Sequence, residues 1–264
     1  MNIIIKKVKL VAAPEPVFVG TRLTVVASDG QMTFKIVSAK KVADYPCIRV
    51  DWNDGIVDEI AGDISNLEHT YEKEGVYEIE IGDDITSLSI YSSTGSEAYL
   101  PMLVRLYSNS PSLTSLTANA LRNAVNLVEF DLVETGITTL MVGTFAGCSS
   151  LRSVAWLPKG LTALGTNTFQ NCTSLSTLPV LPVGLKALGI AHFRGCSGLQ
   201  GRLDFPHVET LTYSSSGIGP FIECPGITEI HFSESHKESI QASIGWQKSQ
   251  NLGAANATVF FDLL

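Results

Sequence analysis

The stretch TFAGCSSL at residues 144–151 returns 24 positions later as TFQNCTSL at residues 168–175. Apolar residues of three kinds recur through this region in separate rows, each with a spacing of 24. The rows are Phe145, Phe169 and Phe193; Cys148, Cys172 and Cys196; and Leu127, Leu151, Leu175 and Leu199. Recurrence at a fixed period of about 20 to 29 residues is typical of a solenoid. One such unit is too small to bury its own apolar face, so we expect successive units to stack on each other.

A second set of apolar positions supports the same register. Ile137, Leu161 and Leu185 have the same spacing as the phenylalanine row, and Leu140, Leu164 and Leu188 follow them with that spacing as well. Residues 119–142, 143–166 and 167–190 therefore form three units in register. A fourth unit begins at Ala191 and is longer, because the interval from Phe193 to Phe221 exceeds that from Phe169 to Phe193. We expect the extra residues in the loop from Tyr213 to Gly219.

The chain has five cysteines, and four of them belong to the repeat. One unit before Cys148 the same position holds Ala124, so this position requires a small apolar side chain. We therefore predict buried free thiols rather than disulfides. An apolar interior raises the pKa of a thiol and makes it unreactive, which argues against nucleophilic catalysis by this row.

Residues 1–84 show a different pattern, with short runs rich in β-branched and aromatic residues at 17–26, 33–42, 48–52 and 76–81. In the last run Glu78 and Glu80 alternate with Tyr77, Ile79 and Ile81. Such alternation is typical of a strand with one buried face. Turn residues separate the runs, so we predict a small antiparallel β-sandwich.

Three pieces of this region, VDWNDG at 50–55, HTY at 69–71 and GVYEI at 75–79, occur in order. They resemble the PKD-type immunoglobulin-like domain, which has a tryptophan-containing strand ending in Gly-Asp-Gly, then His-Thr-Tyr and a Gly-x-Tyr strand. Asn53 stands where that family usually has glycine, and the family's phenylalanine after the tryptophan is missing. The resemblance implies a PKD-like, Ig-like β-sandwich over residues 1–84, with His69 in a packing role.

The unit Phe-x-x-Cys-x-x-Leu, followed by a Leu-x-x-Leu row, resembles the BspA-like leucine-rich repeats of bacterial surface proteins. This resemblance covers about residues 85–232 and implies a right-handed solenoid with a parallel sheet on one face. The remaining residues, 233–264, are expected to form a C-terminal cap, with a helix at 238–246 and a closing strand at 259–262, because solenoids must cover their last apolar face. The predicted fold is thus mainly β, with domains at residues 1–84 and 85–264.

The composition of the chain excludes several classes of protein. Its 264 residues are 45% hydrophobic and 17% charged, which is typical of a folded protein. The net charge of −8 gives no basic surface for nucleic acid, and we expect no such partner. No long uninterrupted apolar run predicts a transmembrane segment. The N-terminal segment does not resemble a signal peptide, because its lysines follow the apolar residues.

Motifs that carry chemistry are missing from the sequence. There is no HExxH, no Gly-x-Ser-x-Gly and no glycine-rich phosphate loop, and none of the five histidines has metal-ligand spacing to a cysteine. We therefore expect neither enzyme activity nor a cofactor. Residues 51–84 hold twelve acidic side chains and one basic one, Lys73. Calcium binding is the alternative interpretation of this stretch, but its spacing does not match an EF-hand, and Asp54 before Gly55 is explained as a turn former.

The exposed strand face of the solenoid is the best candidate for a binding site. If Leu151, Val154 and Trp156 point inward, strand alternation sends Ser153 and Ala155 outward. A shift by one unit adds further positions in each direction, and the row continues near the cap. The predicted partner-binding face is Glu129, Asp131, Ser153, Ala155, Thr177, Pro179, Glu229 and His231.

These observations predict a non-enzymatic module that binds a protein or glycan through this face. The two resemblances imply adhesion or recognition at a bacterial cell surface, or a secreted protein, although no signal peptide is recognised in this chain. The alternative hypothesis is a structural component of a larger assembly, such as a phage virion or a secreted particle. The missing export signal motivates that alternative.

Overall fold

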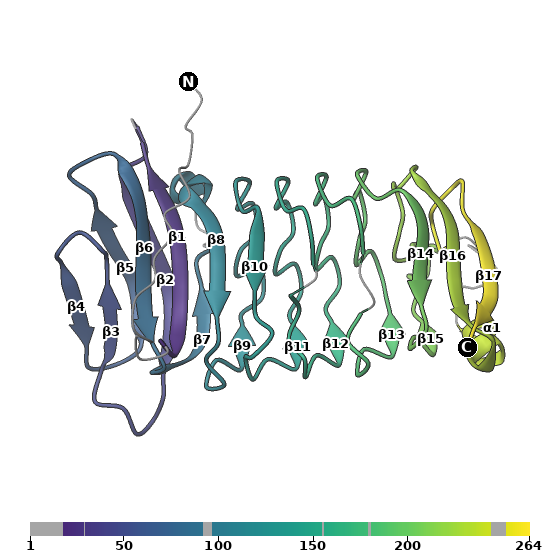
Figure 1. Ribbon diagram of the computed structural model, residues 1–264, viewed down its shortest axis with the longest axis horizontal. Helices are drawn as coiled ribbons and strands as arrows, with labels where there is room; N and C mark the ends of the chain where they lie inside the picture. The colour runs from purple at the N-terminus through teal and green to yellow at the C-terminus, as the bar shows by residue number, and fades with distance from the viewer. Residues whose placement is uncertain (1–17, 29, 92–96, 155, 179–180, 244–251) are drawn as a thin grey trace, which may run out of the picture.

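The computed structural model describes residues 18–28, 30–91, 97–154, 156–178, 181–243 and 252–264. The molecule is an elongated stack of β-structure, with the N-terminal sheets at one end and the C-terminal strands at the other (Figure 1). Between them lie turns of similar shape, as the repeat predicts. The prediction of a mainly β solenoid is therefore confirmed.

The N-terminal part consists of antiparallel strands arranged in two sheets. β1, β6, β3 and β4 are neighbours in one sheet, and β5, β2 and β7 in the other. The four runs predicted from their β-branched and aromatic residues correspond to β1, β2, β3 and β6, whereas β4 and β5 were not predicted. The strand bounds are β1 (Gly20–Ala27), β2 (Thr33–Lys41), β3 (Ile48–Asp51), β4 (Val57–Ile60), β5 (Ile64–Thr70), β6 (Gly75–Gly82) and β7 (Ile85–Ser89).

In the repeat region short parallel strands alternate with turns. β11 pairs with β12 so that Thr139 faces Ala163, its equivalent in the next unit. A second ladder of backbone hydrogen bonds joins the turns. Phe145 N donates to the Thr168 carbonyl over 2.9 Å, and Phe169 N makes the equivalent bond to the following unit. The elements are η1 (Glu97–Met102), β8 (Leu103–Ser108), β9 (Ser115–Leu116), β10 (Glu129–Asp131), β11 (Thr139–Leu140), β12 (Ala163–Leu164), β13 (Ala187–Leu188), β14 (Gly201–Phe205) and β15 (Thr210–Leu211).

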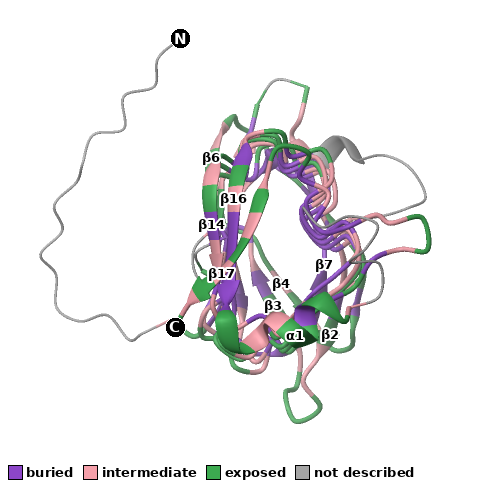
Figure 2. Ribbon diagram, turned by 90° about the vertical axis from the view of Figure 1, so that its right-hand side faces the viewer, coloured by how far each residue is buried: buried purple, intermediate pink, exposed green. Residues whose placement is uncertain are grey.

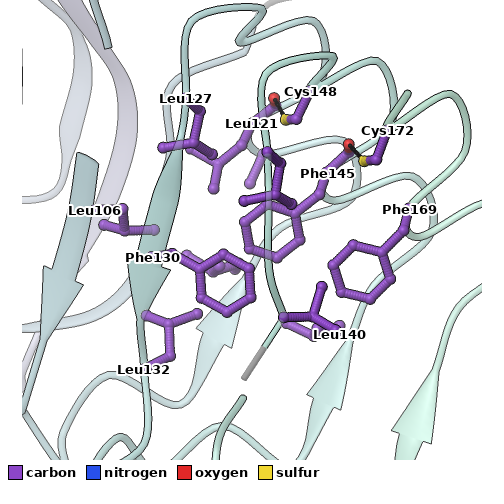
Figure 3. Close-up of a cluster of buried hydrophobic side chains, with 14 of the residues drawn as sticks. Leu106, Leu121, Leu127, Phe130, Leu132, Leu140, Phe145, Cys148, Phe169 and Cys172 are labelled. Carbon is purple, nitrogen blue, oxygen red and sulfur yellow. Dashed lines mark hydrogen bonds between the residues drawn. The ribbon is translucent and has the colours of Figure 1, made fainter. Parts of the chain in front are cut away.

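The core of the stack is a column of phenylalanine rings. Phe145, Phe169, Phe193 and Phe221 follow one another with ring centroids 5.4 Å apart and the planes within 10° of parallel. All four side chains are fully buried. Figure 3 shows how Phe130 continues the column towards the N-terminal sheets, where its ring lies 4.6 Å from that of Phe145. The predicted phenylalanine row is therefore the buried spine of the fold.

A parallel row of thiols lies beside the rings. Cys172 donates from Sγ to the backbone carbonyl of Phe145, and Cys196 does the same to Phe169, over 3.3 and 3.1 Å. The four cysteines of the row are buried and free, as predicted. Each thiol thus satisfies a carbonyl of the preceding unit, which fits a small side chain with a weak donor at this position.

The two sheets of the N-terminal part continue into the repeats. β8 pairs antiparallel with β1 and parallel with β10, and β7 pairs antiparallel with β2 and parallel with β9. The change from antiparallel to parallel pairing therefore takes place within β7 and β8, not in a linker (Figure 1). A division into domains at residues 84 and 85 remains a prediction, and the strand pairing joins both sides of it.

The cap consists of β16 (Ile227–Ser233), η2 (Glu234–His236), α1 (Lys237–Gln241) and β17 (Thr258–Leu263). β17 pairs in parallel with β16 and corresponds to the predicted closing strand. The helix predicted at 238–246 ends at Gln241, and positions 244–246 of that prediction lie outside the described residues. None of the helices in the described part of the chain has the length and apolar character needed to cross a bilayer.

Candidate partner-binding face

One side of the stack presents the outward residues of successive strands as an extended surface. Seen along the stack, β6, β14, β16 and β17 lie on the same side of the molecule (Figure 2). We call this side the long face and define it by Arg105 on β8, Glu129 on β10, Arg202 on β14 and Glu229 on β16. Strand register aligns the first two and the last two as neighbours.

Charged residues on the long face are matched across strands. Arg105 Nε lies 2.6 Å from Glu129 Oε1, and on the adjacent strand β1 Arg22 Nε lies 2.8 Å from Glu80 Oε1. Both pairs are partly exposed, and pairs of this kind contribute only about 0–1 kcal/mol to folding. Their main consequence is that the two guanidinium groups are held in place by carboxylates.

A groove of about 370 Å³ lies where the N-terminal sheet meets the first repeats. Its walls come from β1, β6, β8 and β10 and from the following repeat, which contributes Trp156. A second hollow of about 200 Å³ shares Tyr107, Asp131 and Trp156 with the first and extends towards Asn109. The two hollows therefore lie on either side of the same three side chains.

Trp156 corrects the predicted alternation. It was expected to point inward with Leu151 and Val154, which are indeed buried, but 54% of Trp156 is exposed. Residues 151–154 are not a regular strand, so their side chains do not alternate strictly through to Trp156. The backbone is fixed instead by a hydrogen bond of 3.0 Å from Leu132 N to the Trp156 carbonyl, and Leu157 takes the buried position.

The other predicted face residues have varied surroundings. Glu129 and Thr177 are exposed, whereas Asp131, Ser153 and Glu229 are half-buried. Ala155 and Pro179 lie outside the described residues. The groove brings Glu129 and Asp131 together with Trp156, and it also includes Arg22, Tyr107 and Arg105, which sequence reasoning missed. Their strand pairing is the reason, because β1 and β8 were not assigned to one sheet with β10.

His231 does not lie open on this face as predicted, since only 3% of it is exposed. The ring of Phe260 on β17 stacks on it with centroids 4.6 Å apart. Its Nδ1 lies 2.6 Å from Asp262 Oδ1 and its Nε2 lies 3.1 Å from Glu229 Oε2. The closing strand thus covers His231, and the predicted row ends at Glu229.

The acidic N-terminal stretch uses its carboxylates within the fold. Asp54 Oδ2 lies 2.7 Å from His69 Nε2, and Asp58 accepts a hydrogen bond of 2.8 Å from the Trp52 indole. The His69 ring stacks on Trp52 with centroids 4.6 Å apart, and Tyr71 makes an edge-to-face contact with His69. Within the described ranges, no three His, Cys, Asp or Glu side chains are grouped as a metal site would require.

The thiols of the repeat are buried and protonated at neutral pH. Burial raises the pKa of Cys224 to about 12, and burial likewise raises the pKa of Cys148. Burial also lowers the pKa of His192 to about 4, and this histidine is not part of the groove. These cysteines therefore do not supply an ionised thiol that could act as a nucleophile.

Comparison with protein-family models identifies the family to which these repeats belong. The model described as "BspA type Leucine rich repeat region (6 copies)" matches residues 69–200 and 114–249, more than half of the chain. The chain belongs to the BspA-type leucine-rich repeat family. Its repeats are a protein-interaction module. The match begins within β5 of the N-terminal part, which agrees with the continuity of the sheets.

Solved structures similar to this BspA-type chain come from three bacteria. A leucine-rich repeat protein of Treponema pallidum is 16% identical, with 67% of this chain and 70% of that chain covered and a TM-score of 0.40. A leucine-rich cell surface protein of Faecalibacterium prausnitzii is 15% identical over 68% and 52%, with a TM-score of 0.44. A Bacteroides ovatus leucine-rich repeat protein is 14% identical over 83% and 78%, with a TM-score of 0.32. Comparison with curated protein sequences finds none that matches.

Proposed function

We propose that this BspA-type chain is a non-enzymatic recognition module that acts at a bacterial cell surface or after secretion. It binds a protein or glycan partner through the long face. The observation that carries the proposal is the groove at Trp156, where an exposed aromatic ring stands among polar side chains. Exposed aromatic residues within a hollow are typical of binding surfaces rather than of ordinary solvent-facing strands.

The shape of this surface suits a large partner. The long face runs along the stack from the N-terminal sheet to the cap (Figure 1), so a partner can make contacts over many strands. Solenoids use such extended surfaces for binding because each repeat adds a similar strip. The two hollows at Trp156, of about 370 and 200 Å³, add local contacts within this extended surface.

The N-terminal part is proposed to be a PKD-like, Ig-like domain that presents and stiffens the binding surface. The stack of Trp52, His69 and Tyr71 supports this, because the three residues of the motif pack on each other. β8 joins this part to the groove by pairing with both β1 and β10. The N-terminal sheet therefore fixes one wall of the groove.

The proposal is tested by screening the purified chain against immobilised extracellular-matrix proteins and a glycan array. The triple variant Glu129→Arg, Asp131→Arg and Glu229→Arg should lose at least about tenfold in affinity for any partner, since it reverses charge along the long face. The matched control is Glu223→Arg, which also breaks an ion pair, with Arg194, but lies in a turn outside the groove.

Saturable binding that the triple variant loses and the control keeps would support recognition through the long face. Equal loss in both variants would contradict it. The alternative function, a component of a phage virion or secreted particle, predicts a different result. In that case the chain would bind neither the matrix proteins nor the glycan array, and it would self-associate in sedimentation velocity experiments.

A further inference from the structure

We propose that the groove at Trp156 binds a neutral oligosaccharide, with one sugar ring stacked on the indole. This deepens the proposed function, on which it rests, by naming the class of ligand that one part of the long face selects. The site consists of Trp156, Tyr107, Asp131, Thr24, Arg105 and Glu129.

Trp156 supplies a flat apolar surface that is left open. More than half of it is exposed, although the rest of its repeat is anchored by buried Leu157 and by the Leu132 backbone bond. Among the described residues its indole N–H has no hydrogen-bond acceptor. A ring with an apolar face and a free polar tip suits a ligand that is itself apolar on one face and polar at its rim. A sugar ring has C–H groups on one face and hydroxyls around its edge.

Polar groups around the indole match those hydroxyls. Tyr107 and Thr24 bring hydroxyl groups that donate and accept, whereas Asp131 brings carboxylate oxygens that only accept. Asp131 Oδ1 already accepts from Val133 N over 3.1 Å, which orients the carboxylate. A few placed polar groups beside an apolar platform are the usual means by which a site fixes the orientation of a small ligand.

Charge on the groove walls selects against anionic ligands. Two guanidinium groups and three carboxylates line it, and both cations are already paired with carboxylates, Arg105 with Glu129 and Arg22 with Glu80. A sulfated or carboxylated polymer would need free cations, which this arrangement does not provide. Leu106 and Phe130 are almost fully buried beneath the surface, so the open aromatic surface of the groove comes from Trp156 and Tyr107. An uncharged polyhydroxylated chain can use this surface without needing free cations.

The two hollows indicate that the ligand extends over more than one ring. They share Tyr107, Asp131 and Trp156, and the second continues along Ser108 and Asn109. A sugar stacked on the indole would therefore have space for its neighbours on both sides. The strands β1, β8 and β10 hold the walls in register, so little ordering is needed when the ligand binds.

The experiment measures binding of uncharged hexasaccharides to the full chain by isothermal titration calorimetry. The probes are maltohexaose, cellohexaose, xylohexaose, mannohexaose and chitohexaose, with heparin as a polyanionic comparison. For the hexasaccharide that binds, Trp156→Ala should lose about tenfold or more in affinity, and Trp156→Phe should retain most of it. Tyr45→Ala is the matched control, because Tyr45 is also an exposed aromatic residue but lies between β2 and β3 and lines neither hollow. Thermal unfolding followed by circular dichroism checks that each variant folds.

Loss of affinity in Trp156→Ala with an unchanged affinity in Tyr45→Ala would support the proposal. It is overturned if the alanine variant binds the hexasaccharide as tightly as the wild type, or if heparin binds at this groove in preference to the neutral probes. If none of the five hexasaccharides binds while matrix proteins still bind through the long face, this inference fails and the proposed function stands. If neither class of partner binds, the proposed function fails as well.

Discussion

The rings of Phe145 and Phe169 lie 5.4 Å apart and within 7° of parallel, although they belong to successive repeats of the chain. The backbone turn that carries each ring donates to the next turn, since Phe145 N bonds to the Thr168 carbonyl. Ring stacking and backbone pairing thus have the same period. The repeat buries its apolar row only by adding neighbours, so a defect in one turn should weaken both adjoining interfaces.

Phe169→Ala should lower the free energy of unfolding by about 3–5 kcal/mol, because it opens a cavity between two fully buried rings. Chemical denaturation followed by circular dichroism measures the change. Phe169→Leu, which keeps most of the volume, should lose clearly less. A loss below about 1 kcal/mol in the alanine variant would mean that the column is not a core.

Two glycines with nearly the same φ angle should respond differently to substitution by alanine. Gly195 has φ of +69° and Gly201 has φ of +70°, but a Cβ on Gly195 would overlap the Asn171 side-chain oxygen, whereas one on Gly201 meets nothing within 4 Å. Gly201→Ala should therefore cost about 1–2 kcal/mol from the backbone alone. Gly195→Ala should cost at least about 1 kcal/mol more, because the neighbouring repeat must move.

Unfolding midpoints of the two glycine variants measure this difference, and a substitution at Asn171 tests its cause. Asn171→Ala removes the obstructing oxygen, so in its background Gly195→Ala should behave like Gly201→Ala. If the two glycine variants are equally unstable in the wild-type background, the close approach between the repeats would be refuted.

Labelling of the native chain with Ellman's reagent at pH 8 should modify Cys47 alone. The other four cysteines are buried, and burial raises the thiol pKa of Cys148, Cys172 and Cys224, so the row presents neither access nor thiolate. A single thiol per chain should react in buffer and all five in guanidinium chloride. Cys47→Ser should abolish the native reaction, and rapid modification of further thiols would contradict the packing of the row.

His192 should make stability depend on pH. Burial lowers its pKa from the usual 6.5 to about 4, and its Nδ1 accepts a hydrogen bond from Gly189 N over 3.1 Å. The unfolded chain therefore takes up the proton first, so this contribution is complete above about pH 6.5 and is lost as the pH falls through about 4. The loss should approach about 3 kcal/mol.

Denaturant unfolding of the wild type and His192→Asn between pH 7 and pH 4 isolates this effect, because asparagine can accept the same hydrogen bond and does not titrate. The difference in unfolding free energy between the two chains should change steadily in favour of the variant as the pH falls. A constant difference would mean that His192 has the same proton affinity in the folded and unfolded chain.

Much of the fold could be predicted from the sequence because its core is periodic. The rows through Phe145 and Cys148 give the register directly, and the resemblance around Trp52 and His69 implied a packing role for His69. β8 was harder to interpret, since it pairs with β10 on one side and, on the other, with β1 from the far end of the N-terminal part. Short apolar runs do not reveal such partners.

The binding face was predicted less well, for two physical reasons. The alternation applied to Trp156 assumes a regular strand, but the chain there is irregular, so the indole points outward. His231 was placed on the open face by its alternation with Ile230 and Phe232, but Phe260 covers it from β17, the last strand of the chain's described part. Neither the loss of regularity nor a cover supplied by a distant strand has a local sequence signal.

The most direct test of recognition through the long face is the affinity of a partner found in the screen for two single variants, measured by surface plasmon resonance. Glu129→Arg breaks the ion pair with Arg105 inside the groove, and Glu223→Arg breaks the pair with Arg194 outside it. We expect about a tenfold loss or more for Glu129→Arg and a change of less than about twofold for Glu223→Arg. Equal affinities in both variants and the wild type would contradict the assignment of the binding face.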